Sequence, residues 1–149
     1  TESAEETAGD YYDFIPMPNN CIGLVVGDVT GHGIGPALLM AETRAYLRIL
    51  AGENSDVGQI LTRANRVLNE DIGSEHFVTL LFVMLDPKAR TIRYASAGHP
   101  PGLWLDRKGK PKPELTRTGI PLGLRPNTEY GASGEIKLKS GDLLRHFDR

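Results

Sequence analysis

The segment of residues 27–33, GDVTGHG, holds the side chains best suited to chemistry. Asp28 ends a short apolar run, residues 22–29, and precedes glycines that are too small to block access to its carboxylate. Carboxylate oxygens and exposed backbone carbonyls are the ligands that Mg²⁺ and Mn²⁺ prefer. The pattern therefore favours a cation site at Asp28. Two alternatives remain open: a tight turn in which the glycines adopt positive φ and Asp28 caps a helix, or backbone amides that cradle phosphate.

A second acidic segment, residues 9–14 (GDYYDF), comes earlier in the chain. Its two carboxylates, Asp10 and Asp13, stand three residues apart in a stretch with strand propensity. Because side chains alternate along a strand, we expect Asp10 and Asp13 on opposite faces, so they should not bind one ion side by side. An acidic strand end with both aspartates solvated explains this pattern equally well.

The histidines give weaker signals. His32 lies among the glycines, and His99 lies between glycine and proline in residues 97–101 (AGHPP), where a hydrogen-bonded turn residue is the expected role. His76 and His146 have no motif around them. The sequence contains no cysteine and histidine cluster with zinc spacing, no nucleophile elbow, and no P-loop lysine after the glycines.

The composition is that of one soluble globular domain: 149 residues, 40% hydrophobic, 24% charged, with a net charge of −2. The near-neutral charge gives no electrostatic reason to expect nucleic acid as a partner. No apolar stretch is long enough for a membrane helix, and residues 1–8 are acidic and unlike a signal peptide. A single cysteine, Cys21, cannot form an internal disulfide, so the cytoplasm is the expected compartment.

Two amphipathic helices are expected to help position these residues. The first runs from Pro36 to about Leu50, and proline suits its first turn. The second has a clearer apolar stripe, and Ser55 or Asp56 can cap its start. The stripe of the first helix consists of Leu38, Ala41, Ala45 and Ile49, and that of the second of Val57, Ile60, Leu61, Ala64 and Leu68. We expect these stripes to cover the apolar face of a sheet.

After the helices the apolar pattern changes to that of strands. Residues 77–85 form a run long enough to cross a sheet and be buried on both faces, residues 86–90 have turn chemistry, and residues 91–97 alternate. These segments predict an antiparallel hairpin. Two further strands are expected at residues 102–105 and 135–138. Two helices followed by hairpins predict an α+β fold, with the helices layered on a mostly antiparallel sheet.

Taken in order, the motifs of the chain carry a family resemblance from about residue 8 to residue 144. They are residues 9–14 (GDYYDF), 26–33 (VGDVTGHG), 37–41 (ALLMA), 77–80 (FVTL), 95–101 (ASAGHPP), 119–124 (GIPLGL) and 141–144 (GDLL), together with Asn65, Leu68 and Asn69. In this order and spacing they resemble the SpoIIE/RsbU-type branch, the sporulation phosphatases and sigma-factor regulators, of the PP2C-like (PPM) serine/threonine phosphatases.

The resemblance implies a central β-sandwich of mostly antiparallel strands flanked by helices, with a binuclear Mn²⁺ or Mg²⁺ site at one end. Asp10 and Asp28 match the family's metal-binding aspartates and are the implied catalytic residues, and the backbone carbonyl of Val29 matches a further ligand. The implied reaction is hydrolysis of phosphoserine or phosphothreonine on a protein, by a metal-activated water that attacks phosphorus in line.

The C-terminal end departs from the family pattern. The family continues from Gly-Asp-Leu-Leu into Tyr-Thr-Asp-Gly, whose aspartate serves the second metal, whereas this sequence ends with residues 145–149 (RHFDR). Arg149 stands where that aspartate belongs, and a one-residue slip would offer Asp148 instead. We therefore expect a single phosphatase domain over residues 1–149 that lacks the C-terminal part of the family fold, with residues 1–7 as the remnant of a linker.

In this branch the implied substrate is a phosphorylated regulatory protein, commonly an anti-sigma-factor antagonist. An upstream sensor or receiver domain and a second copy in a homodimer are further implied partners, and neither nucleic acid nor a membrane is expected. The rival hypothesis is an inert pseudophosphatase that binds a phosphoprotein without turnover, because the sequence lacks the C-terminal metal aspartates. A nucleotide-binding module built on the glycine turn is a third hypothesis.

Overall fold

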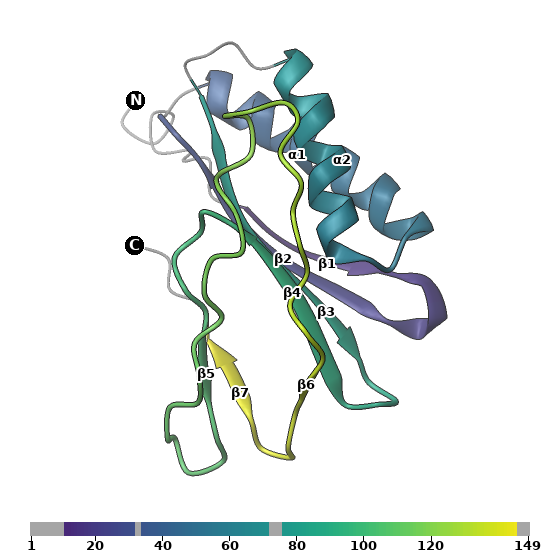
Figure 1. The fold of residues 1–149 in the computed structure, drawn as a ribbon, viewed down its shortest axis with the longest axis vertical. Helices are drawn as coiled ribbons and strands as arrows, with labels where there is room; N and C mark the ends of the chain where they lie inside the picture. The colour runs from purple at the N-terminus through teal and green to yellow at the C-terminus, as the bar shows by residue number, and fades with distance from the viewer. Residues whose placement is uncertain (1–10, 32–33, 72–75, 146–149) are drawn as a thin grey trace.

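The computed structural model describes residues 11–31, 34–71 and 76–145. Figure 1 shows two helices packed on one face of a twisted sheet, with a small second sheet at the end away from the helices. The five strands of the main sheet follow the order β1-β2-β3-β4-β6, and every neighbouring pair is antiparallel. They are β1 (Tyr11–Pro16), β2 (Ile22–Val29), β3 (Val78–Asp86), β4 (Thr91–Ala97) and β6 (Ile136–Lys137). The second sheet pairs β5 (Leu103–Leu105) with β7 (Leu143–Arg145), and the helices are α1 (Ile34–Glu53) and α2 (Val57–Asp71).

Strand β2 has two different faces because its side chains alternate. Val25 and Val29 are buried in the core beneath the helices. Leu24 and Val26 pack in a second apolar cluster on the other face of the sheet. Asp28 continues the second set, so the strand directs it away from the helices.

Helix α2 covers the sheet as its sequence predicts. Its five stripe residues are all buried, with at most 1% of their surface exposed. Asp56 caps the helix, since its Oδ1 accepts hydrogen bonds from the amides of Gly58 (2.9 Å) and Gln59 (3.2 Å). These contacts satisfy amides that have no partner inside the helix.

Helix α1 faces the sheet with a different side from the one predicted. Leu38 and Ile49, expected in the covering stripe, are 66% and 62% exposed. The prediction of the covering face was therefore wrong, although the helix itself is confirmed. The buried face consists of Pro36, Leu39, Met40, Thr43, Leu47 and Ala51. Both sets have helical spacing, so periodicity alone could not decide which one packs on the sheet.

The remaining strands confirm the predicted α+β class. The hairpin forms from β3 and β4, and the two further strands appear as β5 and β6. Strand β7 was not predicted, because it is only three residues long, two of them exposed, and gives no apolar alternation. Neither helix in the described ranges combines the length and apolar character needed to cross a bilayer. Asp10, His32 and Asp148 lie outside the described residues.

Candidate metal centre

Asp28 lies at the end of β2, where the strand enters the glycine turn. Its side chain is half-buried, and it pairs with Thr79 of β3 in the antiparallel register. Residues directly opposite each other in such a pair point to the same face, with their Cβ atoms about 5 Å apart. Asp28 and Thr79 are therefore neighbours on the sheet face opposite the helices.

The backbone of Val29 is oriented by the same ladder. Val29 pairs with Val78, whose amide donates to the carbonyl of Leu122 (2.9 Å) and so points away from β2. The next pair is hydrogen-bonded, because the amide of Thr30 donates to the carbonyl of Phe77 (3.1 Å). Bonded and non-bonded pairs alternate in an antiparallel ladder, so the carbonyl of Val29 points toward the β1 side of β2.

The glycine before Asp28 has a packing role. A Cβ atom at Gly27 would lie 2.6 Å from Cδ1 of Leu80 and 3.0 Å from the carbonyl oxygen of Thr79. It would also lie 3.3 Å from Cε of Met40, which packs on this point from α1. Glycine therefore lets α1 and β3 approach the strand closely and fixes the position of Asp28.

The turn after β2 is attached to the start of β3. Gly31 has φ of 88°, which is the positive φ expected of a glycine here. Nδ1 of His76 lies 3.2 Å from the carbonyl oxygen of Thr30, and the amide of Phe77 donates to Oγ1 of Thr30 (3.1 Å). These contacts hold the backbone that leaves Asp28.

Thr79 also contacts a buried histidine. Its Oγ1 lies 3.1 Å from Nδ1 of His99, and only 3% of the surface of His99 is exposed. His99 follows Gly98, which has φ of 65° and contacts Pro121 so closely that a Cβ atom would lie 2.5 Å from its ring.

Asp13 lies on the helix side of the sheet and is bound by arginine. Its carboxylate accepts hydrogen bonds from Nη2 (2.6 Å) and Nε (2.7 Å) of Arg48 and from the hydroxyl of Tyr11 (2.9 Å). Burial raises the pKa of Asp13, but the hydrogen bonds from Arg48 and Tyr11 outweigh this effect and hold the pKa below its usual range. Burial, with the Asp13 carboxylate, raises the pKa of Tyr11 far above its usual range. Asp13 therefore fastens β1 to α1.

Asp142, the aspartate of the Gly-Asp-Leu-Leu motif, also has a structural environment. It accepts hydrogen bonds from the backbone amide of Lys139 (2.9 Å), from Nζ of Lys112 (2.9 Å) and from Nε1 of Trp104 (3.2 Å). The Lys139 amide, followed by Lys112 and Trp104, holds the pKa of Asp142 below its usual range against a smaller effect of burial. These bonds tie the turn before β7 to β5 and leave no role for Asp142 at the end of β2.

The oxygen ligands at the end of β2 suit one side of a site for a hard cation. The carboxylate of Asp28 and the carbonyl of Val29 leave the strand at adjacent positions. Across the described ranges, no group of three or more histidine, cysteine, aspartate or glutamate side chains is close enough to hold a metal. Tyr11, which follows Asp10 in the chain, pairs with Gly27, which precedes Asp28.

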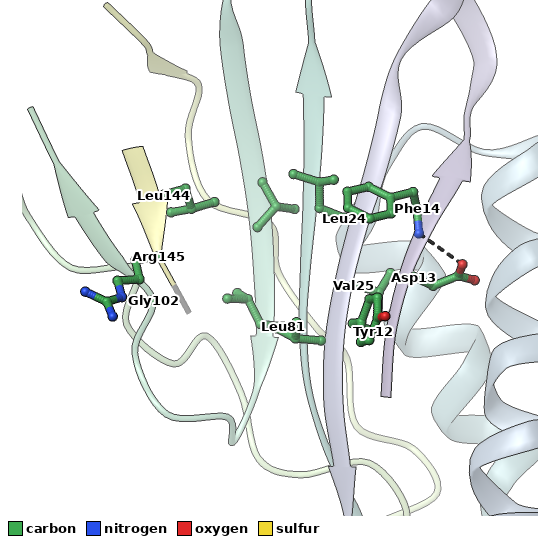
Figure 2. A pocket seen from close by; sticks show the side chains of 11 residues that line it. Tyr12, Asp13, Phe14, Leu24, Val25, Leu81, Gly102, Leu144 and Arg145 are labelled. Carbon is green, nitrogen blue, oxygen red and sulfur yellow. Dashed lines mark hydrogen bonds between the residues drawn. The ribbon is translucent and has the colours of Figure 1, made fainter. Parts of the chain in front are cut away.

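A groove of about 280 Å³ opens on the same face of the sheet, but its chemistry differs. Figure 2 shows Leu24, Leu81 and Leu144 around it, while Asp13 points toward the helices. Asp28 is not part of its lining. Most of its lining is apolar, so this groove is not the candidate metal site.

Comparison with known proteins agrees with the order of the motifs. Residues 18–147 match the family described as Stage II sporulation protein E (SpoIIE). This range includes the end of β2, the β3–β4 hairpin and the segment around His99. The chain belongs to the SpoIIE family. The resemblance predicted from the motifs is thereby confirmed.

The SpoIIE-family chain is similar to two phosphatases of Bacillus subtilis. It is 28% identical over 144 residues to the phosphoserine phosphatase RsbU, with 97% of this chain and 42% of RsbU covered. It is 27% identical over 150 residues to the phosphoserine phosphatase RsbP, with 98% of this chain and 37% of RsbP covered. The chain therefore spans less than half the length of these relatives.

Solved structures match the fold of this SpoIIE-family chain. The RsbU and RsbW domains of Rv1364c from Mycobacterium tuberculosis match with a TM-score of 0.79 and 29% identity, over 93% of this chain and 39% of that one. The PP2C phosphatase domain of SpoIIE from Bacillus subtilis matches with a TM-score of 0.77 and 20% identity, over 91% of this chain and 40% of that one. RsbX in complex with magnesium matches with a TM-score of 0.66 and 19% identity, over 93% and 66%. The PP2C-type fold is confirmed.

Two residues near Asp28 were not predicted as part of this site from the sequence. Thr79 had a signal, since it is the one polar residue in the apolar run of residues 77–85. His76 had none, because only the fold brings it to the carbonyl of Thr30.

Proposed function

We propose that this chain is the metal-binding part of a protein phosphatase that removes phosphate from serine or threonine of a regulatory protein. In this proposal Asp10, Asp28 and the carbonyl of Val29 are ligands of a pair of Mn²⁺ or Mg²⁺ ions. Asp10 and Asp28 are the catalytic carboxylates. We further propose that residues 1–149 belong to a single phosphatase domain.

The observation that carries the proposal is the position of Asp28 in a SpoIIE-family chain. A rigid, buried strand ends at a half-buried carboxylate, and the next carbonyl points to the β1 side of that strand. The described end of β1 reaches this point, since Tyr11 pairs with Gly27. Tyr11 is buried on the helix side, so strand alternation predicts Asp10 on the face of Asp28.

The chemistry follows from these oxygen ligands. When bound, the ions supply an activated water for in-line attack on phosphorus and stabilise negative charge on the phosphoryl oxygens. In this proposal Asp28 binds the cation, and the close packing at Gly27 and the ladder to β3 hold its position. Gly31 is exposed and has no side chain, which keeps the approach to the carboxylate open for a phosphorylated segment.

The substrate class is proposed from the relatives. RsbU and RsbP are named phosphoserine phosphatases, and the Rv1364c structure contains an RsbU domain and an RsbW domain. A phosphorylated anti-sigma-factor antagonist fits a phosphatase of this kind. The family resemblance implies an upstream sensor or receiver domain and dimerisation, and we propose both, with action in the cytoplasm.

Hydrolysis of p-nitrophenyl phosphate and of a phosphoserine peptide, with Mn²⁺ and after chelation, tests the proposal. The full-length wild-type protein should be active only with metal, and its Asp28→Asn variant should lose most of the activity. Asp86→Asn is the matched control. Asp86 ends β3, whereas Thr79, the residue opposite Asp28, lies near the start of that strand, and Asp86 accepts hydrogen bonds from the turn amides of Lys88 and Ala89. Full activity of Asp28→Asn, or a folded full-length wild type that is inactive with Mn²⁺ and also with Mg²⁺, would contradict the proposal.

The pseudophosphatase remains the second candidate, because the described ranges contain no complete metal-binding group. It predicts binding of a phosphoprotein without hydrolysis, at an affinity that chelation does not change. The same assay, combined with phosphopeptide binding, separates the two functions.

A further inference from the structure

Polar side chains on the sheet face opposite the helices suggest a role for His99, which the sequence assigned only to a turn. Thr79 stands directly opposite Asp28, on the same face of the sheet. Its hydroxyl contacts Nδ1 of His99 at 3.1 Å. A threonine hydroxyl can donate one hydrogen bond and accept others at the same time. Thr79 can therefore bond to His99 and to a neighbouring carboxylate together.

The position of His99 is fixed by its backbone. Gly98 has φ of 65°, and its amide donates to the carbonyl of Gly119 (2.8 Å). The ring of Pro121 fills the place that a Cβ atom of Gly98 would need. With 3% of its surface exposed, His99 is held between these segments and reaches Thr79 with little freedom. A rigid partner of this kind orients the group that it bonds to.

We propose that His99 is a positioning residue, which acts through the Thr79 hydroxyl to hold the Asp28 carboxylate in the orientation that binds the cation. This inference rests on the proposed function, because it requires Asp28 to be a metal ligand. Ligating carboxylates are commonly hydrogen-bonded by a second layer of residues, and loss of such a partner costs roughly 10- to 100-fold in metal affinity.

The alternative explanation of the same contact is structural. A buried histidine needs a hydrogen-bond partner, and Thr79 satisfies that need whether or not Asp28 binds a metal. Loss of stability in a variant does not separate these explanations. Metal affinity does separate them, provided that the variants remain folded.

The experiment is calorimetric titration of Mn²⁺ into the protein without substrate, with thermal unfolding of each variant as the fold check. Thr79→Val keeps the shape and removes the hydroxyl, and it should weaken Mn²⁺ binding roughly 10-fold or more. Thr79→Ser keeps the hydroxyl and should bind within about threefold of wild type. His99→Ala should resemble Thr79→Val, and His99→Asn, with a polar atom near the position of Nδ1, should recover part of the affinity.

Ser96→Ala is the matched control. Ser96 is fully buried on the same face, opposite Leu81, and its Oγ has no hydrogen-bond partner among the described residues. Removing this hydroxyl should leave Mn²⁺ affinity at the wild-type value. That result would show that losing a buried hydroxyl on this face does not by itself weaken Mn²⁺ binding.

The outcomes distinguish this inference from the proposed function. If Asp28→Asn binds Mn²⁺ weakly while folded Thr79→Val and His99→Ala bind it as tightly as wild type, the positioning role is wrong and the metal site stands. If wild type binds no Mn²⁺, or Asp28→Asn binds it normally, the metal site is wrong and the positioning role with it. If Thr79→Val does not fold, Thr79→Ala and His99→Asn decide between the same outcomes.

Discussion

Asp13 and Asp28 lie on neighbouring strands but on opposite faces of one sheet, and their surroundings differ accordingly. Asp13 faces the helices, where Arg48 donates two hydrogen bonds to its carboxylate. Asp28 faces the other side, beside Thr79 and close to the glycine turn. Arginine ties the Asp13 carboxylate to the fold, whereas the Asp28 carboxylate lies where a strand enters a glycine turn, a setting that suits a cation ligand. Residue type alone does not distinguish the two.

The largest expected difference between the two aspartates is in activity. Asp28→Asn should lower Mn²⁺-dependent phosphatase activity by at least about 100-fold, because removing a ligand charge removes much of the metal's stabilisation of the transition state. Asp13→Asn should keep activity within a few-fold of wild type. Steady-state kinetics at saturating Mn²⁺ measure both. Equal losses of activity in Asp28→Asn and Asp13→Asn would contradict different roles for the two aspartates.

Gly98→Ala should cause a large loss of stability. Its φ of 65° is unfavourable for alanine, and the new Cβ atom would lie 2.5 Å from the ring of Pro121. We expect the free energy of unfolding to fall by about 2–3 kcal/mol. Urea denaturation measures this change, with Gly109→Ala as a control that also has positive φ, 77°, but has open space around it. A loss in Gly98→Ala no greater than in the control would argue against the tight packing behind His99.

Asp13→Asn should lower the free energy of unfolding by about 1 kcal/mol at neutral pH, since the amide keeps only part of the bonding to Arg48 and Tyr11. The pKa of Asp13 is lowered in the folded state, so its ionised form stabilises the fold above the unfolded pKa and this stabilisation is lost as pH falls. The difference between wild type and variant should therefore shrink below about pH 4. Chemical denaturation at pH 7 and pH 3 tests this, and a difference that grows in acid would contradict it.

The smallest effect is expected on the outward side of α1. Leu38→Gln should change the free energy of unfolding by less than about 0.5 kcal/mol, because Leu38 is 66% exposed. Leu47→Ala, on the buried side of the same helix, should cost about 2–4 kcal/mol. Thermal unfolding compares them. A larger loss in Leu38→Gln than in Leu47→Ala would indicate that α1 packs on the sheet with the face predicted from the sequence.

Most elements of the fold could be predicted because their local signals agree with their packing. The strand of residues 22–29, the β3–β4 hairpin and the buried stripe of α2 with its Asp56 cap were all predicted. The buried side of α1 could not be predicted, because two sets of residues have helical spacing and tertiary packing, such as that of Met40 over Gly27, selects one of them.

The site could be predicted in part. Asp28 had both a local pattern and a family match, whereas Asp10 depends on the family and lies outside the described residues. Thr79 and His99 are 20 residues apart in the chain, so their contact follows only from the folded hairpin and the turn after it. Local patterns cannot report such contacts.

Mn²⁺-induced broadening of backbone amide signals by NMR shows directly whether Asp28 binds the cation, because it locates the bound ion. With substoichiometric Mn²⁺, we expect the greatest loss of signal at Asp28, Val29 and Thr79, with Asp142 and the Asp13–Arg48 pair much less affected. Asp28→Asn should abolish this localised loss. Broadening centred on Asp142 or Asp13, or unchanged broadening in Asp28→Asn, would contradict the assignment of Asp28 as a metal ligand.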